Sequence, residues 1–210
     1  MKKQGVLFDF DYTLGDCTEA IVESFRAAFR ELGYPPPETE AIRATVGLML
    51  DDAFTQLTGL PAPETFTPRF RHYALPRMAR DARLLPGAAE LLARLHGQGL
   101  RLGLVTSKSR QMAREIAKKF RFPMEVIVSC QDVEHPKPHP EALLLAAEQM
   151  KLPVEALVYV GDAAVDARAA AAAGMDFIAV TTGTTGREIF SGLPHFAIIP
   201  DLFHFPTWEE

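Results

Sequence analysis

Residues 5–14, GVLFDFDYTL, carry the most informative pattern of the chain: a short apolar run followed at once by two acids, Asp9 and Asp11. A run of this kind favours a strand buried on both faces, and such strands are usually central in a parallel sheet. Both acids would then lie at the carboxyl end of that strand, where open α/β sheets bind their ligands. The sequence therefore predicts an α/β protein with chemistry at this edge.

The spacing of Asp9 and Asp11 also suggests which chemistry. Two acids held close together repel, and a hard divalent cation offsets that cost. Mg²⁺ fits better than Zn²⁺, because no Cys or His cluster accompanies the pair. A cation there could hold a phosphate while one aspartate attacks phosphorus and the other handles the proton of the leaving oxygen. A solvated Asp-x-Asp turn is the alternative, and this stretch alone leaves both interpretations open.

The composition of the chain restricts the function classes. With 210 residues and 48% apolar content, the chain can bury the core of one domain that carries a sizeable insertion. A net charge of −5 and a pI near 5.7 argue against a broad surface for nucleic acid. No apolar run approaches the roughly 20 residues that span a bilayer, and the two cysteines make neither a disulfide framework nor a zinc site. We expect a cytoplasmic protein, a monomer or small homo-oligomer, without nucleic-acid or membrane partners.

An all-helical insertion is predicted after the first strand. Asp16 and Glu19 form a helix-start signature, and apolar residues then recur at helical spacing up to Gly33. Further helical patches are predicted at 38–46, 50–57 and 68–79, the last kinked at Pro76. The sequence thus predicts a cap domain at 16–83, inserted into a core domain made of 1–15 and 84–210.

From Pro86 onward, helical and strand patterns alternate, which is typical of a parallel sheet with helices on both faces. The predicted helices are 87–96, 110–120, 138–150 and 163–173. The predicted strands are 101–106, 125–129, 157–161 and 176–180, with a weaker one at 196–199.

A hydroxyl pair follows the strand RLGLVT, which ends in Thr106 and is followed by Ser107. A hydroxyl there, with backbone N–H groups entering the next helix, is suited to holding phosphate oxygens. The alternative is a routine polar residue at a strand end.

A lysine lies within the proline-rich stretch 135–140, HPKPHP. The flanking prolines bias Lys137 towards an extended conformation, and Pro138 can then start a helix. A lysine held this rigidly can act as a fixed positive charge between a carboxylate and a transferring phosphoryl group. The alternative is a proline-rich turn with a solvated lysine.

The stretch 157–174 brings two more acids. A buried strand delivers Asp162 to the same edge of the sheet, and Asp166, four residues later in the following helix, falls on the same face. Asp162 is then a natural third metal ligand, and Asp166 a supporting partner for Lys137 or for a metal-bound water. The alternative role of Asp162 is that of a helix N-cap.

These four stretches together resemble the haloacid dehalogenase-like hydrolase superfamily, and the chain is most similar to its phosphoglycolate phosphatase-like phosphatases, which carry a helical cap after the first strand. The resemblance covers nearly the whole chain. It rests on DFDYT at 9–13, the strand ending in Thr106, Lys137 in KPHP and GDAAVD at 161–166. It implies a Rossmann-like core fold and a phosphorylated small molecule as substrate.

The resemblance also implies residue roles. Asp9 would be the nucleophile that forms an aspartyl-phosphate, and Asp11 the general acid and then the base. Thr106, Ser107 and Lys137 would bind the phosphoryl group. Mg²⁺ would be held by Asp9, the backbone carbonyl of Asp11 and Asp162, with Asp166 in support. Two departures stand out: many relatives have glycine in place of Tyr12 and an apolar residue in place of Gly15.

Two other functions stay open on this core. A sugar phosphomutase of the beta-phosphoglucomutase kind would use the same motifs, but the apolar stretch 46–50 of the predicted cap offers no evident second phosphate site. A non-catalytic protein could use the cap as an interaction surface, although a scaffold has no physical need for so costly a cluster of acids. A C–halogen hydrolase is disfavoured, because such enzymes do not need the acid/base group that Asp11 supplies.

Overall fold

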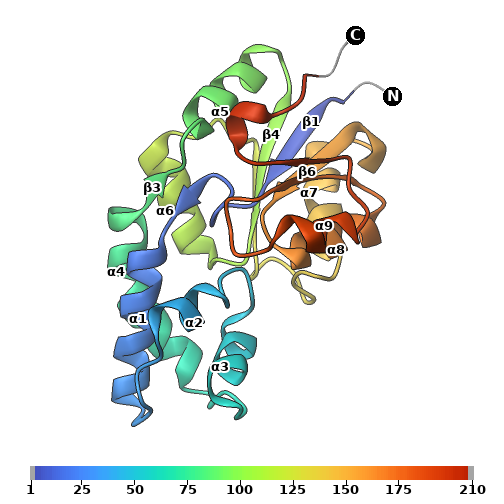
Figure 1. The fold of residues 1–210 in the computed structure, drawn as a ribbon. Coiled ribbons are helices and arrows are strands. Elements are labelled where there is room, and N and C mark those ends of the chain that lie inside the picture. Colours follow the sequence, from blue (N-terminus) through green and yellow to red (C-terminus); the bar gives the residue numbers. More distant parts are fainter. Residues whose placement is uncertain (1–2, 208–210) are drawn as a thin grey trace. The chain divides into compact units, whose positions relative to one another are not determined.

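The structure is a computed structural model that describes residues 3–207, drawn in Figure 1. Trp208, to which the sequence assigns no role, lies outside the described residues. The described chain divides into two compact units. One comprises the residues up to Asp16 together with those from Leu84 onward, and the other comprises Cys17–Arg83.

The first unit is built on a six-stranded sheet in the order β5-β4-β1-β6-β7-β8, and every pair in it is parallel. The predicted α/β fold with a parallel sheet is therefore confirmed. The strands are β1 (Gly5–Phe8), β4 (Arg101–Thr106), β5 (Val126–Ser129), β6 (Leu157–Gly161), β7 (Asp176–Val180) and β8 (Ala197–Ile199).

Strand β1 is flanked on both sides, and this explains its apolar sequence. Phe8 is paired in register with Leu104 of β4 and Val160 of β6, and Val6, Leu7 and Phe8 are fully buried. The hydrogen bonding continues beyond β1, because Asp9 N donates to the Val160 carbonyl over 2.9 Å. The carboxyl ends of these three parallel strands therefore meet at one edge of the sheet.

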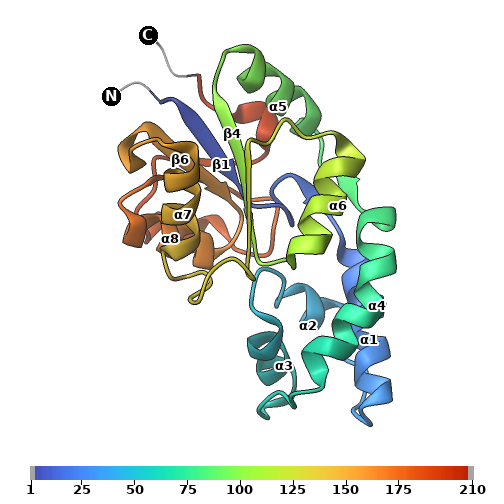
Figure 2. The same cartoon turned by 180° about the vertical axis from the view of Figure 1, so that it is seen from behind.

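Helices cover both faces of the sheet, as Figures 1 and 2 show from opposite sides. Helices α5 (Ala88–Gly97) and α6 (Arg110–Phe120) lie on one face, and α7 (Glu141–Met150) and α8 (Ala164–Ala173) on the other. The second face encloses a core in which Leu143 and Met150 of α7 and Ala170 of α8 pack against the sheet. Short helices complete the unit: η1 (Val154–Ala156), α9 (Arg187–Ser191) and η2 (Leu202–His204).

The start of α7 corrects one prediction, since the helix begins at Glu141 and not at Pro138. The Lys137–Pro138 peptide bond is cis, and His139 N donates to the Pro136 carbonyl over 3.0 Å. A turn therefore occupies the proline-rich segment, and Pro140 takes the N-cap position. A proline is tolerated there, because the first N–H groups of a helix have no partner within the helix.

Two strands of two residues each form a separate sheet, β2 (Gly15–Asp16) and β3 (Arg83–Leu84). Next to them, Leu85 N donates to the Leu14 carbonyl over 3.0 Å. These strands and α9 were not predicted, because two-residue strands show no pattern and the five residues of α9 show no complete helical period.

The second unit, Cys17–Arg83, is helical and is held together by aromatic side chains. Its helices are α1 (Thr18–Glu31), α2 (Thr39–Arg43), α3 (Leu50–Thr58) and α4 (Phe66–Asp81), and α1 packs against α4. The rings of Phe25, Phe29, Phe54, Phe66 and Phe70 form a chain of contacts with centroid distances of 4.7–6.4 Å. Such ring pairs add to the stability that burial provides.

Three details of this unit differ from prediction. Cys17 is the N-cap residue of α1 and makes no side-chain cap, so the N-cap expected at Asp16 lies one residue too early. Helix α2 ends at Arg43, before the predicted 46, and the chain continues in turns. Helix α4 is longer than the predicted 68–79, since it begins at Phe66 and ends at Asp81. Within residues 3–207, none of the helices has the length and apolarity that crossing a bilayer requires.

Candidate active site

Lys137 lies at the centre of a buried polar cluster in the first unit. Its Nζ donates to Asp166 Oδ1 over 2.7 Å, to the Tyr159 hydroxyl over 2.9 Å and to Asp9 Oδ1 over 3.1 Å. These partners come from α8, from β6 and from the residue that follows β1. All three donors of the ammonium are thus used, which satisfies a group that would be very costly to bury alone.

Three carboxylates meet around this lysine. Asp9, Asp162 and Asp166 are only 4%, 5% and 0% exposed, and each offers an oxygen within 4.8 Å of the others. Thr13 Oγ1 donates to Asp162 Oδ1 over 3.2 Å and fixes that side chain. Three acids facing one ammonium leave an excess of negative charge inside the protein.

The pKa values reflect this excess of charge. Burial raises the pKa of Asp9 to about 7, against the opposing effect of Lys137. Burial and the neighbouring Asp166 and Asp9 raise the pKa of Asp162 well above its ordinary value. Burial by itself would lower the pKa of Lys137, but Asp166 and Asp9 together raise it well above the ordinary value. The lysine therefore stays charged, while the pKa values of Asp9 and Asp162 remain raised in spite of its charge.

Asp11 lies beside this cluster, and its two carboxylate oxygens differ in their contacts. Its Oδ2 is 2.8 Å from Lys108 Nζ, whereas its buried Oδ1 has no hydrogen-bond partner among residues 3–207. A buried carboxylate oxygen without a partner is costly, and it marks a place where a further group is expected.

The residues around this edge fit a hard divalent cation. The available donors are carboxylate oxygens, which Mg²⁺ prefers, and the charge of Asp9 and Asp162 is not balanced by Lys137. Asp166 is less available, since its Oδ1 accepts from Lys137 and Tyr159 and its Oδ2 accepts from Ala163 N over 3.1 Å. That last bond also shows that Ala163, not Asp162, occupies the N-cap position of α8. The carboxylate of Asp162 is therefore not needed as a helix cap.

Thr106 and Ser107 lie at the end of β4, the strand next to β1. Thr106 is buried, and its Oγ1 accepts a hydrogen bond from Lys108 N over 3.2 Å. The structure thus brings Asp9, Lys137, Asp162 and Asp166 into one cluster, with Asp11 beside it, and places the two hydroxyl residues on the same edge of the sheet.

Two residues of the cluster were missed in the sequence. Tyr159 lies inside the apolar run of β6, where an aromatic residue normally indicates packing, yet its hydroxyl is 2.9 Å from Asp166 Oδ1. Lys108 follows Thr106 by two residues, and its Nζ also lies 5.7 Å from the centroid of the Phe10 ring. Its position just beyond a strand end was a usable signal, because strand ends of a parallel sheet share one edge.

Two glycines leave room for the acids. A Cβ atom at Gly183 would lie 1.9 Å from Asp162 Oδ2, and one at Gly161 would lie 2.6 Å from Asp166 Cγ. Both positions therefore require a residue without a side chain. Tyr12 has a φ of 53°, in the left-handed region that glycine adopts without strain.

Comparisons with known proteins identify a family and several relatives of this chain. A family model described as haloacid dehalogenase-like hydrolase matches residues 6–180, which hold every predicted site residue. "Probable phosphatase IndB" of Dickeya dadantii is 38% identical over 189 residues, covering 85% of this chain and 81% of that protein. Phosphoglycolate phosphatase of Escherichia coli K12 is 30% identical over 210 residues, covering 86% and 82%.

A solved structure is similar over nearly the whole chain. The crystal structure of "Putative haloacid dehalogenase-like hydrolase" from Bacteroides fragilis superposes with a TM-score of 0.92 at 35% identity. The match covers 96% of this chain and 98% of that one.

Proposed function

Because the chain belongs to the haloacid dehalogenase-like hydrolase family, we propose that it is a Mg²⁺-dependent phosphatase that hydrolyses a small phosphate monoester through an aspartyl-phosphate. The family membership confirms the resemblance found in the motifs. The observation that carries the proposal is the buried contact of Lys137 Nζ with both Asp9 and Asp166, beside Asp162.

In this proposal, Asp9 is the nucleophile. Its carboxylate attacks phosphorus, a bond forms between an Asp9 oxygen and phosphorus, and the bond from phosphorus to the ester oxygen breaks. Lys137, 3.1 Å away, lowers the pKa of Asp9 and fixes the orientation of the carboxylate, but burial still raises this pKa to about 7. Asp9 therefore needs a further positive charge to be fully ionised near neutral pH.

Asp11 moves the proton in both steps. It first gives a proton to the leaving oxygen and then takes one from the water that attacks the aspartyl-phosphate, which releases inorganic phosphate and free Asp9. The contact of Lys108 with Oδ2 holds one side of this carboxylate, and Oδ1 is left for the proton.

Binding of the phosphoryl group is assigned to Thr106, Ser107 and Lys137. Hydroxyl, backbone N–H and ammonium groups stabilise the negative charge that phosphoryl oxygens carry in the transition state. The residues that would hold Mg²⁺ are Asp9, the backbone carbonyl of Asp11 and Asp162, with Asp166 supporting Lys137. When bound, the cation supplies positive charge that offsets the acids and polarises the phosphoryl oxygens.

The names of the relatives suggest the substrate class. Phosphoglycolate phosphatase and "Pyrophosphatase PpaX" of Bacillus mycoides, which is 31% identical over 192 residues, both act on small phosphorylated compounds by name. We therefore propose a phosphoglycolate phosphatase-like activity, in which residues 16–83 form a cap domain and residues 1–15 with 84–210 form the catalytic core.

The test is release of inorganic phosphate from an aryl phosphate and from a panel that includes phosphoglycolate, sugar phosphates and pyrophosphate. We expect release that EDTA abolishes and that added Mg²⁺ restores. Asp9→Asn is the matched control, because it keeps the size of the side chain and removes the nucleophile. Failure to release phosphate from any compound, or equal release by Asp9→Asn, would overturn the proposal.

A further inference from the structure

The surface loop that leads into α7 holds two histidines and a glutamate close together. We propose that His135, His139 and Glu141 bind a divalent transition-metal ion such as Ni²⁺ or Zn²⁺, at a site separate from the oxygen-only site of the core. One ligand atom of each residue lies within 4.8 Å of the other two. His135 Nδ1 is 3.0 Å and His139 Nδ1 is 3.9 Å from the same atom, Glu141 Oε2.

The carboxylate of Glu141 is already fixed by the backbone of the loop. Oε1 accepts from Glu134 N and Oε2 from His135 N, both over 2.9 Å. A carboxylate oxygen has two lone pairs, so Oε1 keeps one for a further partner, whereas Oε2 also lies 3.0 Å from His135 Nδ1, a contact that a bound ion would replace. The glutamate is therefore positioned before any ion arrives.

The two imidazoles are also close to a binding arrangement. Their ring centroids are 4.8 Å apart, and a long hydrogen bond of 3.3 Å from Glu141 N to His139 Nδ1 holds the second ring beside Glu141. Prolines at 136, 138 and 140 alternate with the residues of this loop and restrict its backbone. Little conformational entropy then has to be lost when an ion joins the ligands.

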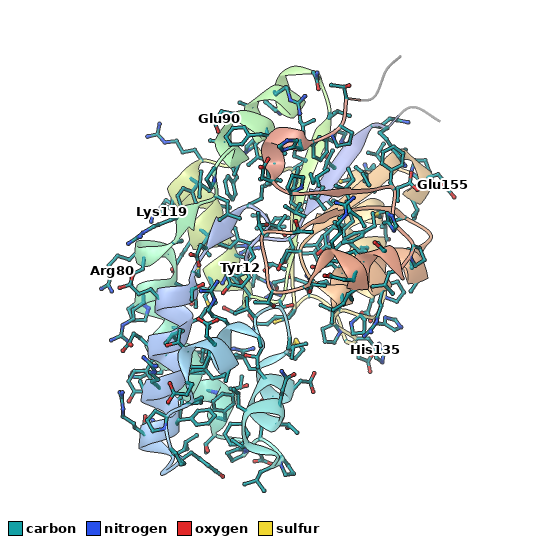
Figure 3. All side chains as sticks on the ribbon, viewed as in Figure 1. Tyr12, Arg80, Glu90, Lys119, His135 and Glu155 are labelled. Carbon is teal, nitrogen blue, oxygen red and sulfur yellow. The ribbon has the colours of Figure 1, made fainter. Side chains whose placement is uncertain are left out.

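The donor set selects the class of ion. Two neutral imidazoles and one carboxylate are typical ligands of Zn²⁺, Ni²⁺ and related ions, whereas Mg²⁺ prefers oxygen atoms only. The side chains of His135 and His139 are 59% and 52% exposed, so an ion can enter from solvent without any opening of the core. Figure 3 shows His135 at the outside of the unit, in the loop next to α7.

This loop also carries Lys137, whose Nζ contacts Asp9 and Asp166 in the interior. An ion that joins His135 to His139 would fix the backbone on both sides of Lys137. We therefore expect binding to raise the thermal stability of the protein. Binding is measured without substrate, so its outcome is independent of the proposed phosphatase activity.

The experiment is isothermal titration of untagged protein with Ni²⁺ in excess Mg²⁺, which fills the oxygen-only site. We expect one Ni²⁺ per chain, an affinity at least about tenfold lower in His139→Gln, and no binding in the double variant His135→Gln/His139→Gln. His96→Gln, at an exposed histidine of α5, is the matched control and should bind like the parent protein.

A spectroscopic measurement identifies the ligands. Co²⁺ bound to imidazole and carboxylate gives weak visible bands without the intense thiolate band that Cys130 would produce. In a separate melting experiment, Ni²⁺ should raise the melting temperature of the parent protein but not that of the double variant. Since both substitutions are at exposed positions, the double variant should keep the circular dichroism of the parent. Absence of Ni²⁺ binding at about 1 mM, or equal binding by the double variant, would overturn the proposal.

Discussion

Lys108 Nζ lies 2.8 Å from Asp11 Oδ2, and both side chains are largely enclosed. The two residues follow neighbouring parallel strands, β4 and β1, so the sheet itself sets the distance between them. If Asp11 transfers the proton, this lysine is a positioning residue that keeps the carboxylate in one orientation.

Replacing Lys108 by Met should therefore lower kcat about a hundredfold and change KM little, because a misplaced acid affects the reaction more than binding. Lys108→Arg should restore part of the rate, since it keeps the charge. Steady-state kinetics of both variants test this. If Lys108→Met raised KM and left kcat unchanged, the lysine would instead contact the substrate.

Asp9→Asn should lower turnover by at least about a thousandfold, because the amide is nearly isosteric but a poor nucleophile. The fold should persist, and the metal-free variant should melt at a higher temperature, since it no longer buries an acid whose pKa is raised. Phosphate release and thermal melting are the two measurements. Full activity in this variant would exclude the covalent mechanism.

Stability should depend on pH and Mg²⁺ together. The pKa of Asp9 is raised from 3.8 to about 7 in the folded protein, so the contribution of this group is fully present below 3.8 and is lost as the pH rises through about 7. Mg²⁺ binds the ionised acids, so the melting-temperature gain from Mg²⁺ should grow between about pH 5 and about pH 8.

The control for this prediction is Asp162→Asn, which removes one of the two acids with a raised pKa. It should abolish most of the gain from Mg²⁺ at the higher pH. A gain that is equal at both pH values would show that the cation does not bind these acids.

Gly183→Ala should weaken the apparent affinity for Mg²⁺ about tenfold or more. The new Cβ would lie 1.9 Å from Asp162 Oδ2, so that the carboxylate has to move. Gly186→Ala in the same loop is a matched control, because its Cβ would meet only the far end of the flexible side chain of Glu188. Activity measured against Mg²⁺ concentration separates the two variants, and identical curves would argue against Asp162 as a ligand.

The bounds of three strands of the parallel sheet were predicted correctly from the sequence. β4, β6 and β7 match the predicted ranges 101–106, 157–161 and 176–180, because each contains a short apolar run that is followed by a polar residue. Helix α6 also matches at 110–120, where Ser109 caps its first turn by accepting from Met112 N. The predicted start of helix α7 at Pro138 was wrong, since alternating prolines are as compatible with a turn as with a helix.

The candidate site was predictable where a residue follows a strand. Asp9, Thr106 and Asp162 come directly after apolar runs, which is why the pattern revealed them. Tyr159 and Lys108 were missed for different reasons. The contact of Tyr159 depends on the depth of its side chain in the sheet, which the periodicity of one segment does not give, whereas the position of Lys108 just beyond a strand end was a signal that the pattern analysis left unused.

The hydrogen bond from Leu85 N to the Leu14 carbonyl has a practical consequence for protein engineering. The chain departs and returns at adjacent backbone positions, so a tight turn of a few residues could join Leu14 to Leu85 directly. Such a shortened protein would retain the whole parallel sheet and every acid of the cluster. Comparing its turnover of a small and a bulky phosphate ester with that of the full chain would measure what the excised helices contribute to substrate selection.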